Sequence, residues 1–432
     1  MKIAIIGYGL QGVSSYKYWR EGNDITICDQ NNIENAPKDA SLQIGDDYLE
    51  NLDQFDLIVR SPSVHPRDII NANGQDITKK ITTNTNEFFK VCPTKNIIGV
   101  TGTKGKGTTS TLITRILEAD GKTVHLGGNI GTPPLEMLEN GISGNDWVVL
   151  ELANFQLIDL KYSPHIAVCL MVVPEHLDWH ESMDEYTEAK QQLFNHQTEN
   201  DISIYYSENE ISEKIASKSI GMKITYFKDP GAHIEQDNIV IEENIVCGIK
   251  DVKLLGKHNL QNICAAVTAV WPITKNINAI SSALQKFTGL EHRLELIKES
   301  NGTKYYDDSF ATTPEAAIVA IQAFKEPKIL IVGGSDKGAE FNNLAHEVSK
   351  NNVKHVVLIG FTADKIRKSL DTVGYSDYSD GGDTIGEIVN EASKYASPGD
   401  VVLLSTGCAS FGLFKDYKDR GDQFKKAVLE LA

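Results

Sequence analysis

One glycine-rich stretch constrains this chain more than any other feature. An apolar run at 96–100 predicts a buried strand, Gly-Thr-Lys-Gly-Lys-Gly-Thr-Thr follows at 102–109, and a helix-compatible run comes next. Glycines between a strand and a helix let backbone N–H groups face an anion, and the helix N-terminus adds a favourable dipole. The stretch predicts an ATP phosphate site in which Lys106 reaches the terminal phosphates and the hydroxyl of Thr108 or Thr109 holds magnesium. The alternative is a turn that only connects the strand to the helix.

Bulk properties exclude several other classes of protein. A chain of 432 residues has room for two to three domains. Its net charge of −17 argues against a nucleic-acid partner. No apolar run reaches the length of a membrane span. The six cysteines are scattered without a C-x-x-C pair, which supports neither a zinc ribbon nor a disulfide framework. We therefore expect a cytoplasmic protein.

Short apolar runs alternate with helical stretches, which predicts an α/β fold with mainly parallel sheets. Expected strands lie at 2–6, 25–28 and 57–59 in a first unit, at 147–150 and 166–173 in a second, and at 329–332, 355–359 and 401–404 in a third. Residues 201–252 look more irregular and are expected to form a β-rich insertion at an edge. Ligands bind at the carboxyl ends of strands in such sheets.

The N-terminus carries a second glycine-rich turn. Gly-Tyr-Gly-Leu-Gln-Gly at 7–12 matches the dinucleotide fingerprint, and Asp29 ends the second expected strand, where a ribose would bind. A dehydrogenase is therefore an alternative. However, a first unit of about 90 residues is half a normal dinucleotide fold, and hydride transfer does not need the loop at 102–109. The turn favours a single nucleotide diphosphate such as a UDP group.

Polar residues follow the expected strands of the second unit. Glu151 comes directly after an apolar run and is a candidate magnesium ligand. The segment 174–180 places two carboxylates and two imidazoles in one short loop, which favours a metal or proton-transfer role. Lys190 lies in a helical pattern and, from the residues alone, is expected to be a solvated helix lysine.

Three more turns of small and polar residues follow expected strands of the third unit, at 305–314, 333–338 and 405–411. Each could be an ordinary connection between a strand and a helix. Together they predict a binding edge for a small anionic substrate, with Lys337 as the partner of a carboxylate.

The ordered set of motifs resembles the Mur ligase family over essentially the whole chain. The matching stretches include 7–12, 101–109, 127–131, 151–157, 175–178, 256–262, 292–293, 308–312, 333–337 and 408–410, with Arg420 and Gly421. The resemblance implies a Rossmann-like UDP-binding domain at 1–92, a central P-loop ATPase at 93–293 and a dinucleotide-fold-like domain for the incoming amino acid at 294–432. It also implies an ATP-dependent ligase of peptidoglycan precursor synthesis, which adds D-glutamate to UDP-MurNAc-L-Ala through an acyl phosphate.

The resemblance assigns roles by position. Expected ATP contacts are Gly102, Thr103, Lys104, Gly105, Lys106, Gly107, Thr108, Thr109, Asn259, Asn262, Arg293 and Asp308. Expected contacts to the UDP substrate are Gly9, Leu10, Gln11, Asp29, Ser61 and Asn129. Expected glutamate contacts are Thr312, Lys337, Ser410 and Tyr417. Expected magnesium ligands are Thr108, Glu151, His176 and Lys190, the last as a carbamylated lysine that has become an anion. Lys106, His176 and Lys190 are the expected catalytic residues.

Some positions depart from the family pattern. Lys104 and Gly107 stand where Mur ligases usually have Asn and a hydroxyl residue. Phe310 stands where many glutamate-adding members have a lysine, and Tyr417 where Phe is common. The Gly-Lys-Gly-Thr order resembles folylpolyglutamate synthases, which are one alternative. Others are a ligase that uses L-glutamate and a binding relative without turnover. The family is mostly monomeric, so a monomer is expected.

Overall fold

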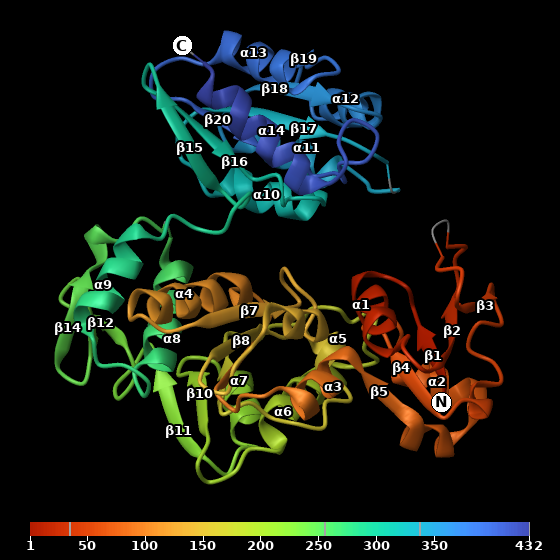
Figure 1. Ribbon diagram of the computed structural model, residues 1–432. Helices are drawn as coiled ribbons and strands as arrows, with labels where there is room; N and C mark the ends of the chain where they lie inside the picture. The colour runs from red at the N-terminus through yellow and green to blue at the C-terminus, as the bar shows by residue number, and fades with distance from the viewer. Residues whose placement is uncertain (34–35, 255, 337, 432) are drawn as a thin grey trace. The chain divides into compact units, whose positions relative to one another are not determined.

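The structure is a computed structural model that describes residues 1–33, 36–254, 256–336 and 338–431 (Figure 1). It divides into two compact units, Met1–Phe287 and Thr288–Ala432. Sheets of mainly parallel strands covered by helices build both units, which agrees with the α/β class predicted from the sequence. No described helix has the length and apolar character that a bilayer crossing requires.

The first sheet of unit 1 is parallel throughout, in the order β3-β2-β1-β4-β5. Its elements are β1 (Lys2–Ile6), α1 (Leu10–Trp19), β2 (Asp24–Asp29), β3 (Ser41–Ile44), β4 (Leu57–Arg60), α2 (Pro66–Asn73), β5 (Ile81–Thr83), α3 (Asn84–Val91) and the short 3₁₀ turns Leu52–Gln54 and Gln75–Lys80. Along β1, Ile3 and Ile5 pack in a cluster with Trp19 of α1, whereas Ile6 packs in another with Ile69 of α2. Because neighbouring strand residues face opposite sides, α1 and α2 cover opposite faces of this sheet.

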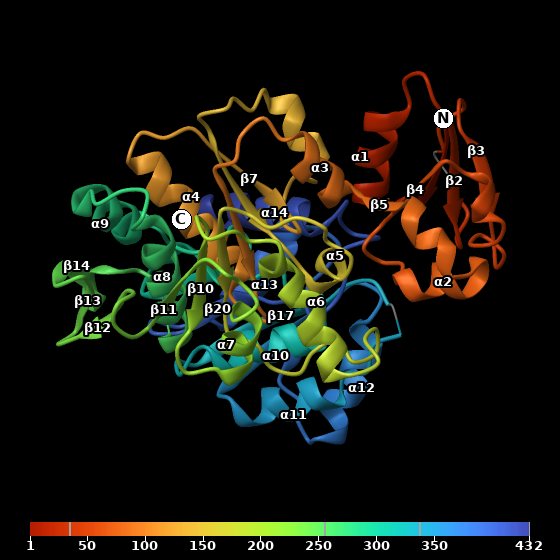
Figure 2. The same cartoon turned by 90° about the horizontal axis from the view of Figure 1, so that it is seen from below.

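The second sheet of unit 1 is also parallel, in the order β11-β10-β9-β6-β8-β7. Figure 2 labels its strands β7, β10 and β11. Its elements are β6 (Ile97–Thr101), α4 (Lys106–Ala119), β7 (Val124–Gly128), a 3₁₀ turn (Leu135–Asn140), β8 (Trp147–Glu151), α5 (Asn154–Leu157), β9 (Ile166–Cys169), α6 (Met183–Asn195), β10 (Ile202–Tyr206), α7 (Glu210–Ala216), β11 (Met222–Tyr226), α8 (Lys257–Val270) and α9 (Ile277–Lys286). The central strand β6 ends at the phosphate loop, between β8 and β9. The loops after these three strands therefore meet at one edge of the sheet.

Two expectations about this sheet need correction. The strand predicted at 166–173 ends at Cys169, because the backbone beyond it pairs with the phosphate loop: Thr103 N donates to Met171 O at 2.9 Å. The predicted insertion at 201–252 is only partly separate, because β10 and β11 belong to the parallel sheet. The strands β12 (His233–Glu235), β13 (Asn238–Ile241) and β14 (Asn244–Gly248), followed by a 3₁₀ turn (Ile249–Asp251), form a small antiparallel sheet.

Unit 2 holds one six-stranded sheet in the order β15-β16-β20-β17-β18-β19, in which only the edge strand β15 is antiparallel to its neighbour. Its elements are β15 (Glu295–Ser300), β16 (Thr303–Asp307), α10 (Pro314–Gln322), β17 (Lys328–Gly333), α11 (Asn342–Lys350), β18 (Val353–Ile359), α12 (Ala363–Thr372), β19 (Tyr378–Asp380), α13 (Ile385–Tyr395), β20 (Val401–Leu404) and α14 (Tyr417–Leu429). Leu330 and Val332 pack with α10, α11 and α12, whereas Ile329 and Ile331 pack with α13 and α14. Helices thus cover both faces.

Candidate active site

The phosphate loop lies between β6 and α4 in an open conformation that glycine permits. Gly102 and Gly105 have φ angles of 147° and 87°, which side chains disfavour. Lys106 is the first residue of α4, and its ammonium donates to the carbonyl oxygens of Gly102 at 3.1 Å and Thr103 at 3.0 Å. Helix α4 therefore directs its N-terminus toward the loop, where an anion is stabilised.

Lys190 lies against the same loop. It belongs to α6, is fully buried, and donates from Nζ to Gly102 O at 3.1 Å. Burial, reinforced by the positive charge of Lys106, lowers the pKa of Lys190 to about 7. The expectation of a solvated helix lysine, drawn from the residues alone, is wrong. Lys106 and Lys190 thus both donate to Gly102 O. With a pKa of about 7, the amine of Lys190 is partly unprotonated at neutral pH.

Oxygen donors lie around the start of α4. Glu151 ends β8, is buried, and accepts a hydrogen bond of 2.8 Å from Asn129 Nδ2 to its Oε1. Thr108 is half-buried on the first turn of α4, and the neighbouring Thr109 has a buried hydroxyl without a hydrogen-bond partner. A carboxylate and hydroxyl groups beside a phosphate loop are the oxygen ligands that magnesium prefers.

The loop after β9 carries His176, whose φ of 58° lies in the left-handed region. Its ring centroid lies 4.8 Å from that of Phe155, and burial lowers the pKa of its imidazole. Glu175 points one carboxylate oxygen toward His176 Nε2 at 3.6 Å and pairs the other with the ammonium of Lys104. Lys104, one of the residues that depart from the family pattern, therefore links the phosphate loop to the loop of His176.

A cluster of His65, His180 and Glu185 lies beside this loop, with its ligand-type atoms within 4.8 Å of one another. His65 Nδ1 accepts from Arg67 N at 3.0 Å, which places the imidazole proton on Nε2, 3.3 Å from Glu185. His180 accepts at Nε2 from the Asn154 amide at 2.8 Å, so its Nδ1 proton faces the same carboxylate at 3.2 Å. In this assignment His180 is hydrogen-bonded to Glu185, whereas the buried Nε2 of His65 lies near the same carboxylate without a hydrogen bond.

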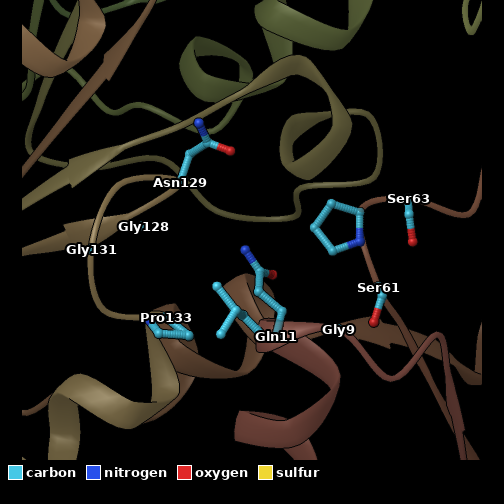
Figure 3. A pocket seen from close by; sticks show the side chains of 10 residues that line it. Gly9, Gln11, Ser61, Ser63, Gly128, Asn129, Gly131 and Pro133 are labelled. Carbon is cyan, nitrogen blue, oxygen red and sulfur yellow. The ribbon is translucent and has the colours of Figure 1, made fainter. Parts of the chain in front are cut away.

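A pocket of about 260 Å³ opens between the two sheets of unit 1. Its lining residues are Gly9, Leu10, Gln11, Ser61, Pro62, Ser63, Gly128, Asn129, Gly131 and Pro133. Figure 3 shows Gln11 and Ser61 on one side and Asn129 on the other. Five of the six residues predicted to contact the UDP substrate line it. The sixth, Asp29, instead accepts from the backbone N–H groups of Tyr8 and Asn31 at 2.8 and 2.9 Å.

Helix α8 reaches the phosphate loop through Asn262. A side chain at Gly105 would meet Asn262 Oδ1 at 2.2 Å, so the two residues are in close contact. Asn262 also donates to Asn259 Oδ1 at 3.1 Å. The structure thus brings Asn262 to the loop at 102–109, with Asn259, a second predicted ATP contact, bound to Asn262.

Four predicted site residues of unit 2 follow β16 or β20 in the chain, namely Asp308, Thr312, Ser410 and Tyr417, whereas Arg293 precedes β15. Asp308 is buried and accepts from Ser405 Oγ at 2.8 Å, and burial raises the pKa of its carboxyl to about 7. Arg293 lies 5.6 Å from the ring centroid of Phe310, whose other neighbour is the Tyr417 ring at 5.2 Å. Ser410 is buried and Thr312 is exposed. Lys337 lies outside the described residues.

Comparison of the sequence with known protein families identifies two matching domains. Residues 100–270 match the Mur ligase middle domain, and residues 292–408 match the Mur ligase glutamate ligase domain. The chain belongs to the Mur ligase family, a class of ATP-dependent ligases that form amide bonds.

Individual relatives show which members of the Mur ligase family this chain is similar to. The chain is 36% identical to the UDP-N-acetylmuramoylalanine–D-glutamate ligase of Clostridium tetani, over 100% of this chain and 97% of that protein. It is 37% identical to the enzyme of the same name from Acetivibrio thermocellus, over 99% and 96%. This likeness extends over the N-terminal sheet and argues against both the dehydrogenase and the folylpolyglutamate synthase alternatives.

Solved structures share the fold. MurC from Thermotoga maritima has a TM-score of 0.58 at 17% identity, covering 99% of both chains. The MurF ligase of the same organism, in complex with ADP, has a TM-score of 0.58 at 18% identity and covers 100% of this chain and 95% of that chain. The α/β fold class predicted from the sequence is confirmed.

Proposed function

We propose that this protein joins D-glutamate to UDP-N-acetylmuramoyl-L-alanine at the expense of ATP. The observation that carries the proposal is the convergence of Lys106 and Lys190 on Gly102 O, beside Glu151, in a chain whose full-length relatives bear that activity in their names. The pocket between the sheets of unit 1 receives the UDP-substrate, and the residues after β16 and β20 receive glutamate through Thr312, Ser410 and Tyr417.

The reaction proceeds in two displacements. A carboxylate oxygen of the substrate forms a bond to the γ-phosphorus of ATP, ADP leaves, and an acyl phosphate results. The glutamate amine then attacks the acyl carbon, loses a proton, and expels inorganic phosphate from the tetrahedral intermediate. Lys106 neutralises charge on the transferring group, and the N-terminus of α4 binds its oxygens.

Thr108, Glu151 and His176 would hold magnesium; the hydroxyl of Thr108 and the carboxylate of Glu151 are the hard oxygen ligands that this ion prefers, and His176 would add an imidazole nitrogen. Magnesium supplies charge stabilisation to the phosphoryl oxygens. Lys190 would join these ligands as a carbamate. In that modification the neutral amine forms a bond to the carbon of CO₂ and releases one proton. A pKa of about 7 supports it, because the free amine is then available near neutral pH.

The test measures phosphate release and the mass of the product with UDP-N-acetylmuramoyl-L-alanine and ATP, adding D-glutamate, L-glutamate or neither. We expect release that requires D-glutamate. Lys106→Met should lower kcat by about 1,000-fold or more, because it removes a charge that acts on the transferring phosphoryl group. Lys90→Met, a surface change next to Glu87, is the control and should behave as the native protein. Release that needs only L-glutamate, or none with either isomer, would overturn the proposal.

A further inference from the structure

Arg60 lies just before the pocket segment 61–64 and is, with Arg420, one of the two fully buried arginines among the described residues. It ends β4, immediately before the pocket residues 61–63. Its guanidinium forms a fork with Asp159: Nε donates to Oδ2 at 2.8 Å and Nη2 to Oδ1 at 2.6 Å. Such a planar, two-point contact fixes orientation as well as distance.

The remaining N–H groups of Arg60 bind backbone carbonyls of the segment 61–64 and of helix α5. Nη1 donates to Ser61 O at 3.1 Å and to Val64 O at 2.8 Å, which shapes the pocket segment. Nη2 donates to Phe155 O at 3.0 Å on α5. One buried cation therefore links the segment of the first sheet to a helix of the second.

A second contact holds the far end of the same segment. His65 faces Glu185 of α6 at 3.3 Å, and the indole N–H of Trp179 donates to Ser63 O at 3.4 Å. Residues 60–65 are thus held at both ends by side chains from the second sheet's helices and loops. Figure 3 shows Ser61 and Ser63 of this segment at the pocket.

Helix α5, which Arg60 contacts, also lies near residues of the candidate active site. It follows Glu151 closely in the chain, and the Phe155 ring lies 4.8 Å from the His176 ring, centroid to centroid. Arg60 therefore connects the pocket segment, through Phe155, to His176, one of the residues that would hold magnesium. Phosphoryl transfer depends steeply on the alignment of the attacking oxygen, so the distance between these parts matters.

We propose that Arg60 is a positioning residue, which sets the pocket segment 61–64 relative to the phosphate loop so that the bound substrate presents its carboxylate to ATP. The inference rests on the proposed function. A purely structural ion pair would affect stability and would not weaken binding of the UDP-substrate more than binding of ADP. A positioning residue is expected to weaken binding of the UDP-substrate selectively. Arg60 itself touches no reacting atom.

The experiment compares Arg60→Met, Arg60→Lys and Asp159→Asn. Binding of UDP-N-acetylmuramoyl-L-alanine and of ADP is measured by calorimetry, and steady-state kinetics give KM and kcat for each substrate. Arg60→Met should weaken substrate binding by about 10-fold and lower kcat by up to about 100-fold, while the Kd for ADP stays within about 2-fold. Arg60→Lys, which keeps the charge and loses the two-point contact with Asp159, should recover little of the substrate affinity and kcat. Asp159→Asn keeps the carbonyl contacts of Arg60 and should reduce substrate affinity and kcat less than Arg60→Met does.

The matched control is Lys161→Met. Lys161 also joins the two parts of unit 1, with Nζ donating to Ile81 O at 3.0 Å, but it does not line the pocket. It should leave both dissociation constants unchanged. Equal loss of ADP and substrate binding in Arg60→Met, or unchanged substrate binding in both Arg60 variants, would overturn the inference. Because binding is measured without turnover, failure of the positioning role can be told apart from failure of the ligase reaction.

Discussion

At the scale of a single residue, the buried ammonium of Lys190 lowers the free energy of unfolding. Its ammonium is buried at the phosphate loop, lies 4.4 Å from the centroid of the Tyr186 ring, and donates to a backbone carbonyl oxygen. The folded-state pKa of about 7 lies well below the ordinary 10.5, so folding disfavours the charged form. Below pH 7 both the folded and the unfolded chain hold the proton, and the full cost of burying the charge applies.

We therefore predict that Lys190→Met raises the free energy of unfolding while it abolishes ligation. The gain should be on the order of a few kcal/mol at about pH 6. As pH rises from 7 toward 10.5, the native protein sheds the proton only in its folded state, so its stability increases and the difference should shrink. Urea unfolding in CO₂-depleted buffer at about pH 6, 8 and 9.5 measures this trend. A variant less stable than the native protein at the lowest of these pH values would show that the contacts of the ammonium outweigh its burial.

Helix α14 organises the candidate glutamate site at the scale of an element. Asp416 caps the helix by accepting from the N–H groups of Lys418 and Asp419, each at 2.9 Å. One turn later, the buried Arg420 donates to Ser309 Oγ at 2.8 Å, Ser309 O at 2.7 Å and Cys408 O at 3.2 Å. The helix thus ties the loop after β16 to the loop after β20.

Arg420→Met should loosen both loops together. Buried carbonyls left without donors cost about 1–3 kcal/mol each, so we expect the free energy of unfolding to fall by about 2–4 kcal/mol. The KM for glutamate should rise by about 10-fold, since its site is misaligned, while the KM for the UDP-substrate changes little. Kinetics with each substrate varied in turn measure both. Lys426→Met, on the same helix, is the control and should change neither value, and parallel increases in both KM values would contradict this assignment.

Elements with local signals were predictable from the sequence. The strand expected at 2–6 has the same bounds in the structure, and the phosphate loop follows β6 as expected, because buried parallel strands and glycine turns are encoded within a few residues. The strand expected at 166–173 is too long, since the apolar residues beyond Cys169 bond to a loop and not to a strand.

Contacts between distant residues were not predictable. Arg60 and Asp159 lie 99 positions apart, and Lys104 and Glu175 lie 71 apart. A single sequence marks each as an ordinary charged residue, and only the fold shows which carboxylate each cation meets. The burial of Lys190 could not be predicted for the same reason: the polar composition of α6 does not show which face of the helix is buried.

On the scale of the whole molecule, buried clusters define what can fold alone. One cluster of unit 1 joins Ile3, Trp19 and Phe88 of the first sheet's region with Leu150 and Leu193 of the second. By contrast, unit 2 has a cluster on each face of its own sheet. The division of unit 1 into domains at residue 92 therefore remains a prediction about architecture, and it does not imply independent folding.

We predict that residues 288–432 fold alone and unfold cooperatively, whereas residues 1–92 do not. The isolated N-terminal fragment would expose its share of the joint cluster and would leave Arg60 without Asp159, and an uncompensated buried charge is destabilising. The fragment 1–287 restores both and should fold. Dispersed amide NMR spectra and a single urea transition are the measurements, made on all three fragments. A cooperative transition in 1–92 would show that its two-faced sheet suffices without the contacts across residue 92.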